Sequence, residues 1–222
     1  FNQEQVSIYS TLLQLLKRVE KPEIVYEKAS VSDLFSSVVP LLKKIGSVTV
    51  SEEVEQEVVT YPLETMFIFR KIKGMIKVRG DFTYGSVVFS TDKNHSVPSA
   101  NGQEVVRNIK KEQKVLEQLQ TFGYQLTEDG YEKKLPAGER LYYFFKAEIP
   151  AFRRLGDVRM GNKLRELFLD ADQHQPQIAV SDSDSWLDVR FDITGIDEHE
   201  IDAVLASLLR NDRFYTLESG EV

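Results

Sequence analysis

The sequence predicts an α+β fold of two related units, each with helices packed on antiparallel hairpins or a sheet. Helical and strand periodicities occur in both halves of the chain, and they do not alternate as β-α-β. A stretch that starts at Leu34 also matches, without gaps, a stretch that starts 110 residues later. This match predicts an internal duplication, with a first α+β unit at residues 1–103 and a second at residues 104–222.

Each copy of the repeat reads as a helix with a proline, a basic pair, an apolar residue before glycine, and a second short helix. The copies run from Leu34 to Val54 and from Phe144 to Leu164. A Tyr-Glu-Lys tripeptide precedes each copy, at residues 26–28 and 131–133, and an amphipathic helix is expected before each tripeptide. The similarity therefore extends over units of about 105–110 residues, longer than the repeats of solenoid proteins.

Local patterns predict a hairpin in the first half of the chain and a break in one helix of each repeat copy. Phe67–Ile72 and Met75–Phe82 flank Lys73-Gly74, which predicts a β-hairpin. Pro40 and Pro150 fall inside helical patterns of the two copies, so each helix is expected to kink or restart there.

The second half contains two predicted helices around a predicted strand. A helix at about 104–122 has an apolar face, with Gly123 at its C-terminal cap. The strand at 186–193 alternates, and its apolar side chains are expected to point inward. Asp197 and Glu200 resemble a capping box at the start of the last helix. The three apolar faces are Val105, Ile109, Leu116 and Leu119; then Leu187, Val189, Phe191 and Ile193; then Ile201, Val204, Leu205, Leu208 and Leu209.

Charge is distributed unevenly along the chain. The net charge is −7 overall, but residues 70–114 carry +6 and residues 168–222 carry −10. A local basic patch attracts phosphate even in an acidic protein, because its field extends over roughly 10 Å at 0.1 M salt. The acidic stretch repels phosphate, and it is expected either to be a solvated surface or to face a basic partner.

Eight basic residues in the segment 70–114 are candidate phosphate contacts. In the hairpin they are expected on one strand face, opposite Ile72, Ile76 and Val78, and in the helix they form a stripe opposite the apolar face. A polar face turned to water remains the alternative. Nearby aromatic residues are candidates for stacking on bases or for the core. The candidate contacts are Lys71, Lys73, Lys77, Arg79, Arg107, Lys110, Lys111 and Lys114, and the aromatic residues are Phe69, Phe82 and Tyr84.

Most catalytic motifs are missing from the sequence. Without cysteine there are no disulfides, cysteine zinc sites, iron–sulfur clusters or thiol nucleophiles. The three histidines do not have metal-ligand spacing, and neither a phosphate-binding G-x4-G-K-[ST] loop nor a nucleophile elbow occurs. Residues 197–200, Asp-Glu-His-Glu, differ in order from the acidic magnesium motif of helicases. We therefore expect no catalytic residue, no metal site and no cofactor in this chain.

The apolar runs and the two ends of the sequence predict where the protein is located and whether it is part of a longer chain. The longest apolar runs are shorter than ten residues, which predicts no membrane-spanning segment. No basic and apolar leader opens the chain, which predicts a cytoplasmic location. Because it begins at Phe1 and stops at Val222, we expect it to be part of a longer protein.

The C-terminal 40 residues carry the most specific resemblance to a known family. A strand ending in Phe-Asp-apolar-x-Gly-Ile-Asp leads to a helix and then to an Arg-Phe-Tyr-x-Leu-x-x-Gly segment. The residues are Trp186–Asp197, Glu200-Ile201, Leu205, Leu208-Leu209 and Arg213–Gly220. This pattern resembles the accessory region that precedes the ATPase core in bacterial Swi/Snf-family helicases.

Upstream motifs extend the resemblance over most of residues 32–222. They comprise an R-x-x-x-x-E helix, a Gly-Tyr corner, a Pro element followed by apolar-Gly-x-Val, and an F-x-Y-G strand end. In this sequence they are Val106-Arg107, Glu112, Leu116, Phe122–Tyr124, Pro150 with Leu155–Val158, and Phe82–Gly85.

The resemblance implies a non-catalytic accessory region of an ATP-dependent motor on double-stranded DNA, with the ATPase core after Val222. ATP and magnesium would then be cofactors of the parent motor, and the partners would be its ATPase lobes in cis and double-stranded DNA. We hypothesise that residues 70–114 contact phosphates while residues 168–222 dock on the motor. The alternatives are a protein–protein interaction module without nucleic-acid contact and a stand-alone enzyme. Whether the region inhibits or activates the motor stays open.

Overall fold

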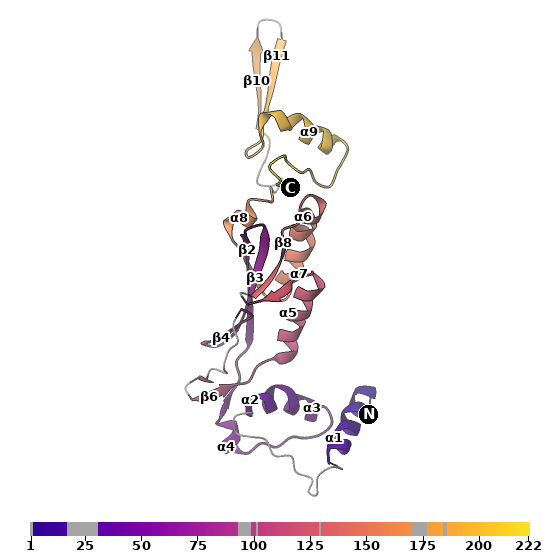
Figure 1. The fold of residues 1–222 in the computed structure, drawn as a ribbon, viewed down its shortest axis with the longest axis vertical. Coiled ribbons are helices and arrows are strands. Elements are labelled where there is room, and N and C mark those ends of the chain that lie inside the picture. Colours follow the sequence, from indigo (N-terminus) through magenta and orange to yellow (C-terminus); the bar gives the residue numbers. More distant parts are fainter. Residues whose placement is uncertain are drawn as a thin grey trace. The chain divides into compact units, whose positions relative to one another are not determined.

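The computed structural model confirms an α+β fold (Figure 1). Its helices and strands are interspersed along the chain. Among the helices of the described residues, none has the length and apolar character needed to cross a lipid bilayer. The residues that the structure describes are 2–16, 31–92, 99–100, 102–128, 130–169, 177–183 and 186–222.

The chain forms two compact units, and each is built from two separate segments. Unit 1 comprises Phe1–Met66 and Gly80–Thr121, and unit 2 comprises Phe67–Arg79 and Phe122–Val222. The units therefore interleave in sequence, because strands β2 and β3 contribute residues to both. The boundary between residues 103 and 104 that the repeat suggests stays a prediction.

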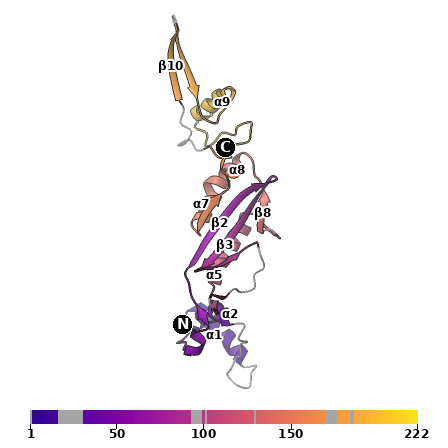
Figure 2. The ribbon, with the colours of Figure 1, turned by 90° about the vertical axis from the view of Figure 1, so that its left-hand side faces the viewer.

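Strands β2 (Leu63–Ile72) and β3 (Met75–Tyr84) form the expected hairpin (Figure 2). Lys73 and Gly74 form its turn with φ values of 48° and 76°. Positive φ at both central residues is the geometry of the two-residue hairpin turn whose twist matches that of the strands. The larger sheet has the order β7-β8-β3-β2-β9, and β4 also pairs with β3.

Unit 1 contains helices and a small three-stranded sheet of order β1-β6-β5, in which β1 and β6 are parallel. Its remaining elements are α1 (Gln3–Leu16), α2 (Val31–Asp33), η2 (Leu34–Val38), α3 (Val39–Leu42), α4 (Glu52–Glu55), β1 (Val58–Val59), β4 (Val87–Ser90), β5 (Ser99–Ala100), β6 (Gln103–Val105) and α5 (Ile109–Thr121).

Unit 2 packs helices on the hairpin strands and also carries a separate two-stranded sheet, β10-β11. Its remaining elements are β7 (Gln125–Thr127), β8 (Gly130–Lys134), α6 (Glu139–Tyr143), η3 (Phe144–Glu148), α7 (Ile149–Arg153), β9 (Asp157–Met160), α8 (Asn162–Arg165), β10 (Gln177–Ser183), β11 (Trp186–Asp192) and α9 (Glu198–Leu209).

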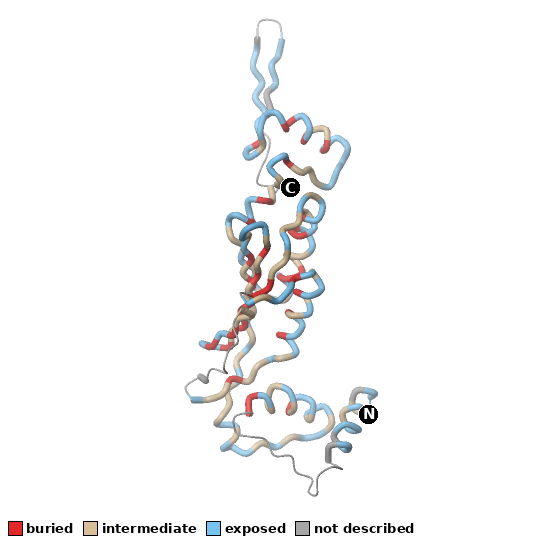
Figure 3. The backbone as a smooth tube through the Cα atoms, viewed as in Figure 1, coloured by how far each residue is buried: buried red, intermediate tan, exposed pale blue. Residues whose placement is uncertain are grey.

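Aromatic side chains form the core of unit 2. Phe67 and Phe69 of β2 are fully buried, and their rings lie 5.0 and 5.2 Å from the ring of Phe152 in α7. Phe144 of η3 and Tyr124 also lie against Phe69. Tilted and edge-on ring pairs at these separations add to the hydrophobic stabilisation from burial. The burial pattern in Figure 3 places this core between the hairpin and the helices of the unit.

Both proline-containing helices restart next to their proline, as expected. A five-residue π-helix, η2 or η3, ends just before an α-helical segment in which Pro40 or Pro150 is the second residue. Proline lacks an N–H and clashes with the preceding turn, so a regular α-helical ladder cannot run through it. The first Tyr-Glu-Lys tripeptide, at 26–28, lies outside the described residues.

The expected helix at 104–122 starts later than predicted. Residues 103–105 form β6, in which Val105 is buried, and α5 begins only at Ile109. The pairing of β6 with β1, some 45 residues upstream, overrides the local helical pattern. The expected C-terminal cap is confirmed, because Gly123 has a φ of 77°.

The prediction that the apolar side chains of the strand at 186–193 are buried is also partly wrong. Ile193 is buried, but Leu187 and Val189 of β11 are 71% and 50% exposed. The strand pairs only with β10, and no described residue covers its apolar face. In α9, Ile201 and Val204 are buried as expected, whereas the end of the helix exposes apolar side chains. These are Leu208 and Leu209, which are 63% and 90% exposed.

Candidate nucleic-acid interface

The eight candidate phosphate contacts belong to two units. Four lie on the β2–β3 hairpin within unit 2, and four lie at or before α5 in unit 1. The hairpin set is Lys71, Lys73, Lys77 and Arg79, and the helix set is Arg107, Lys110, Lys111 and Lys114. Each set is therefore considered as a surface of its own unit.

The hairpin cations do not all share one strand face. Lys71 is two residues from the buried Phe69 and so lies on the core face of β2, while Ile72 lies on the opposite face and is 39% exposed. The expected arrangement is wrong for these two residues. A two-residue turn pairs Ile72 with Met75, so residues of odd number on β2 share a face with residues of even number on β3.

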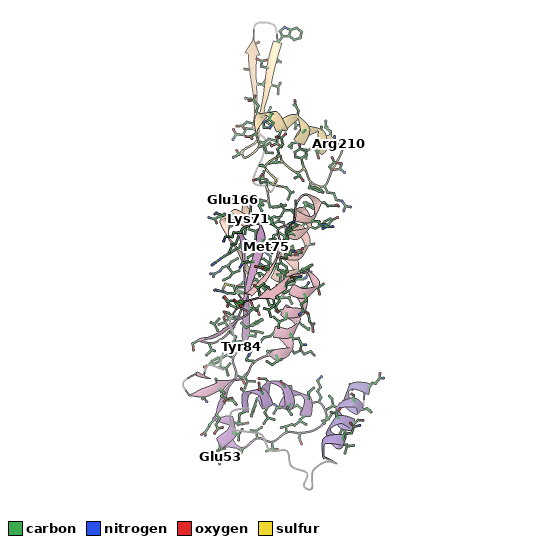
Figure 4. The ribbon with its side chains drawn as sticks, viewed as in Figure 1. Glu53, Lys71, Met75, Tyr84, Glu166 and Arg210 are labelled. Atoms are coloured by element: carbon green, nitrogen blue, oxygen red, sulfur yellow. The ribbon has the colours of Figure 1, made fainter. Side chains whose placement is uncertain are left out.

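The face of the unit 2 hairpin opposite its aromatic core is basic, and we call it the open face. Arg70 and Arg79 lie on it, and so does Lys77, whose Nζ is 3.4 Å from a carboxylate oxygen of Glu132 on β8. Lys134 also lies on this face, because it pairs with Met75. Sequence analysis missed Arg70 and Lys134, although the parity imposed by the two-residue turn was available as a signal for Arg70. In Figure 4, side chains with terminal nitrogens project from this hairpin near Lys71 and Met75.

Arg107 forms an ion pair with the buried Glu112 and is itself partly exposed. Its guanidinium pairs with Glu112, with Nε 3.1 Å from Oε1, and lies 4.2 Å from the centre of the Phe89 ring. Tyr84 donates a 2.6 Å hydrogen bond to Glu112 and accepts one from the N–H of Asn108. Burial, with the bond to Glu112, raises the pKa of Tyr84, so its hydroxyl stays protonated. Arg107 thus fastens the start of α5 to β3 and β4.

The three lysines of α5 are exposed. Lys110 and Lys114 lie on the side of α5 away from the buried Val115 and Leu119, whereas Lys111 is four residues before Val115 and lies at the edge of the apolar face. Arg107 does not belong to the expected stripe, and Lys111 lies beside it. A stripe of exposed ammonium groups on a helix can contact successive phosphates of a nucleic-acid backbone.

The aromatic residues near the basic segment belong to the core. Phe69 and Tyr84 are fully buried and Phe82 is 4% exposed. Base stacking needs an exposed ring face, so the stacking interpretation of these residues is wrong and the core interpretation is confirmed.

A second buried ion pair lies in unit 2, on the core side of β8. Lys133 pairs with Glu148 of η3 at 2.6 Å, and both side chains are largely buried. The Lys133 ammonium also lies 4.5 Å from the centre of the Tyr124 ring. Burial lowers the pKa of Lys133, and the Glu148 carboxylate opposes that effect. Burial, reinforced by Glu148, raises the pKa of Tyr124.

The acidic helix α9 begins with a group of possible metal ligands. Ligand atoms of Asp197, His199 and Glu200 lie within 4.8 Å of one another. Glu200 is 5% exposed and accepts a 2.8 Å hydrogen bond from the N–H of Glu218, so it ties the helix to the C-terminal turn. Asp197 precedes the helix in extended geometry, but its side chain makes no capping hydrogen bond. Of these residues, Glu200 therefore has a structural role.

An apolar cavity of about 370 Å³ lies beside α9 in unit 2. Apolar side chains from α9 and the C-terminal segment line it, and Tyr142 stacks on Phe214 at its edge with the ring centres 5.1 Å apart. Ser207 donates a 3.0 Å hydrogen bond to Asp212, which also pairs with Arg210. These polar groups satisfy one another and form no nucleophile–base pair with a histidine.

Two of the motifs that suggested a family resemblance meet in the folded chain. Glu112 of the R-x-x-x-x-E pattern accepts hydrogen bonds from Arg107 of the same pattern and from the tyrosine of F-x-Y-G. Gly85 ends that motif with a φ of 61°, and a Cβ at this position would lie 3.1 Å from the Tyr61 ring. The motif residues thus stabilise unit 1.

Comparison with known proteins identifies one family. No curated protein and no solved structure matches the chain. Residues 1–222 match the family described as bacterial SNF2 helicase associated. Because this match covers the whole sequence, the chain belongs to the family of regions associated with bacterial SNF2 helicases.

Proposed function

We propose that this chain is a non-catalytic accessory region that positions double-stranded DNA for a Swi/Snf-type ATPase in the same polypeptide and regulates that motor. Family membership supports the association with a helicase. The open face of the unit 2 hairpin supports the contact with nucleic acid. ATP and magnesium belong to the motor in this proposal, and the bacterial cytoplasm is its setting.

In this proposal the basic residues of the open face contact the phosphate backbone of DNA. Arg70 is exposed, Lys73 is exposed in the turn, and Lys77 keeps a half-buried ammonium near the surface. Lysine and arginine contacts to phosphates add affinity without sequence preference. Such binding suits a region that holds DNA for a motor moving along it. The lysines of α5 offer a second phosphate-binding surface on unit 1.

In this proposal the acidic part of unit 2 binds protein rather than DNA. Residues 168–222 carry a net charge of −10, which repels phosphate and attracts a basic protein surface. In this proposal they dock on the ATPase lobes in cis. A protein–protein interaction module without nucleic-acid contact would bind the ATPase lobes but not DNA. Experiments can therefore test the two contacts separately.

An internal duplication is part of the same proposal. The succession of η2, α3 and α4 recurs 110 residues later as η3, α7 and α8. Gly46 and Gly156, also 110 residues apart, each donate to the carbonyl four residues earlier, at Leu42 and Phe152. These local similarities support two copies of one ancestral segment, which now lie in different units.

Reversing the exposed charges of the hairpin should weaken binding to duplex DNA. The variant Arg70→Glu, Lys73→Glu, Lys134→Glu changes three exposed cations of the open face and should raise the dissociation constant roughly tenfold or more at 50 mM salt. Fluorescence anisotropy of a labelled duplex measures the change. A second variant, Lys110→Glu, Lys111→Glu, Lys114→Glu, tests the surface on unit 1 separately.

The control variant changes the same amount of charge elsewhere. Lys43→Glu, Arg140→Glu, Lys163→Glu replaces three exposed cations outside the proposed surfaces and should bind DNA nearly as well as the wild type. Equal losses in the hairpin variant and the control would mean that only net charge matters. If neither surface variant lost affinity for DNA, the proposed contact with nucleic acid would be wrong.

A further inference from the structure

The β10–β11 hairpin has one apolar face that no described residue covers. In its antiparallel register Val180 is opposite Val189, and Leu187 is opposite Asp182, so these side chains share a face. Val180 is 61% exposed and Leu187 is 71% exposed, values typical of surface polar residues rather than of an apolar strand face. Ile178 lies on the same face and is 58% exposed. The pale colour along this hairpin in Figure 3 reflects that exposure.

The other face of the hairpin is mainly polar, although Trp186, which pairs with Ser183 and is 80% exposed, also lies on it. Ser181 pairs with Asp188, and Gln177 pairs with Asp192. The alternation is therefore that of a strand pair with one buried face, although the chain itself supplies no covering layer among the described residues. A two-stranded hairpin is marginally stable alone in water and gains stability from packing on another element.

The negative charge of the β10–β11 hairpin favours a basic protein surface over DNA as the partner of its apolar face. Residues 177–192 contain four aspartates and one arginine, a net of −3. Insertion between DNA bases would bring these carboxylates against phosphates, which repel them. A protein surface with an apolar centre and a rim of lysine or arginine complements both the apolar face and its charge.

We propose that the apolar face of Ile178, Val180, Leu187 and Val189 is the docking surface for an apolar patch with a basic rim on the ATPase lobes of the same polypeptide. This inference rests on the proposed function, and it specifies which part of residues 168–222 makes the contact. The face is the buried centre of the interface, and Asp182, which lies on the same face opposite Leu187, adds a negative charge to it.

Photo-crosslinking in the full-length motor polypeptide tests the inference, because neighbouring residues of β11 point to opposite faces. A benzophenone amino acid replaces Leu187 in one protein and Asp188 in the other, and mass spectrometry maps the cross-linked peptides. We expect cross-links from position 187 to a segment of the ATPase lobes that contains apolar and basic residues. Position 188 should give a cross-link yield lower by roughly tenfold, since its side chain faces away.

A matched pair of substitutions gives the energetic test. Val180→Asp places a carboxylate on the apolar face, and Ser181→Asp places the same group on the polar face one residue away. Both positions are exposed, so neither change disturbs a core. With the benzophenone at position 187, Val180→Asp should lower the cross-link yield by about tenfold or more, and Ser181→Asp should leave it within about twofold.

Several results would overturn the inference. Equal cross-linking from positions 187 and 188 would show docking of the acidic region without a role for this face. Cross-links only to a second copy of the chain, only to added duplex DNA, or to nothing would assign the face to another partner or to solvent. None of these results depends on the charge-reversal variants of the β2–β3 hairpin, so the DNA limb of the proposed function is judged separately.

Discussion

Replacement of Glu148 by glutamine is expected to lower the free energy of unfolding by about 3 kcal/mol, the lower end of the cost of breaking a buried ion pair. The change leaves the Lys133 ammonium buried among Tyr124 and Phe144 without a counter-charge. Urea unfolding of the chain at pH 7, followed by circular dichroism, measures the loss. Because the pair joins β8 to η3, its removal weakens the contact between sheet and helix in unit 2.

The deficit of Glu148→Gln should shrink at alkaline pH. Burial lowers the pKa of Lys133 in the folded state, and without Glu148 nothing opposes that effect. Between the lowered folded pKa and the ordinary lysine pKa, the unfolded chain binds more protons than the folded chain, so stability rises with pH there. Below the folded pKa the full deficit is present. Unfolding at pH 7 and at pH 9.5 measures the trend.

Glu139→Gln is the matched control for this change. Glu139 is an exposed carboxylate on α6, and its replacement should alter the free energy of unfolding by less than about 0.5 kcal/mol. If Glu148→Gln and Glu139→Gln unfolded at the same urea concentration, the buried pair would contribute nothing measurable.

Replacement of Glu112 by glutamine should destabilise unit 1 by about 2–3 kcal/mol, as expected for lost hydrogen bonds to a charged group. Glu112 is 4% exposed and accepts from both Tyr84 and Arg107. The Arg107 side chain is about one-third exposed, so water partly compensates its lost partner and the cost stays below that of a fully buried pair. Urea unfolding again gives the measurement.

An exposed glutamate on the same helix controls for the change at Glu112. Glu117→Gln on α5 removes a solvent-facing carboxylate and should leave stability within about 0.5 kcal/mol of the wild type. Arg107→Ala should destabilise the fold in the same way as Glu112→Gln, whereas Lys110→Ala should not. Equal effects of these two alanine substitutions would contradict a structural role for Arg107.

Local patterns in the sequence were sufficient to predict several helices, strands and turns. Gly74 in a two-residue turn and alternating apolar residues predicted the β2–β3 hairpin, and Pro150 predicted the restart of its helix. Gly123 predicted the end of α5. In each case the residue that decides the geometry lies within the element or next to it, so no distant contact is needed.

Distant contacts explain what the sequence did not predict. Residues 103–105 became a strand because they pair with β1, and that pairing has no local signature. Tyr84 and Glu112 are 28 residues apart, and Lys133 and Glu148 are 15 apart, so the sequence alone does not show that these side chains are in contact. The exposure of Leu187 was unexpected because alternation predicts which face is apolar, but not whether anything covers it.

The candidate interface was predicted in part for the same reason. Counting basic residues located the hairpin and α5, and the structure adds Arg70 and Lys134 to the open face. It also places Arg107 in an internal network. Charge counting does not distinguish a cation that faces water from one that pairs with a buried carboxylate, because the carboxylate belongs to another turn or strand.

The most direct test of the account is a titration of labelled duplex DNA with this chain at 50 and 200 mM salt. Four phosphate contacts predict a loss of affinity of roughly a hundredfold between the two conditions, and six to ten contacts predict roughly three to five powers of ten. Steep salt dependence of this kind is the result that the account predicts. An absence of binding at 50 mM salt, or binding that salt leaves unchanged, would contradict it.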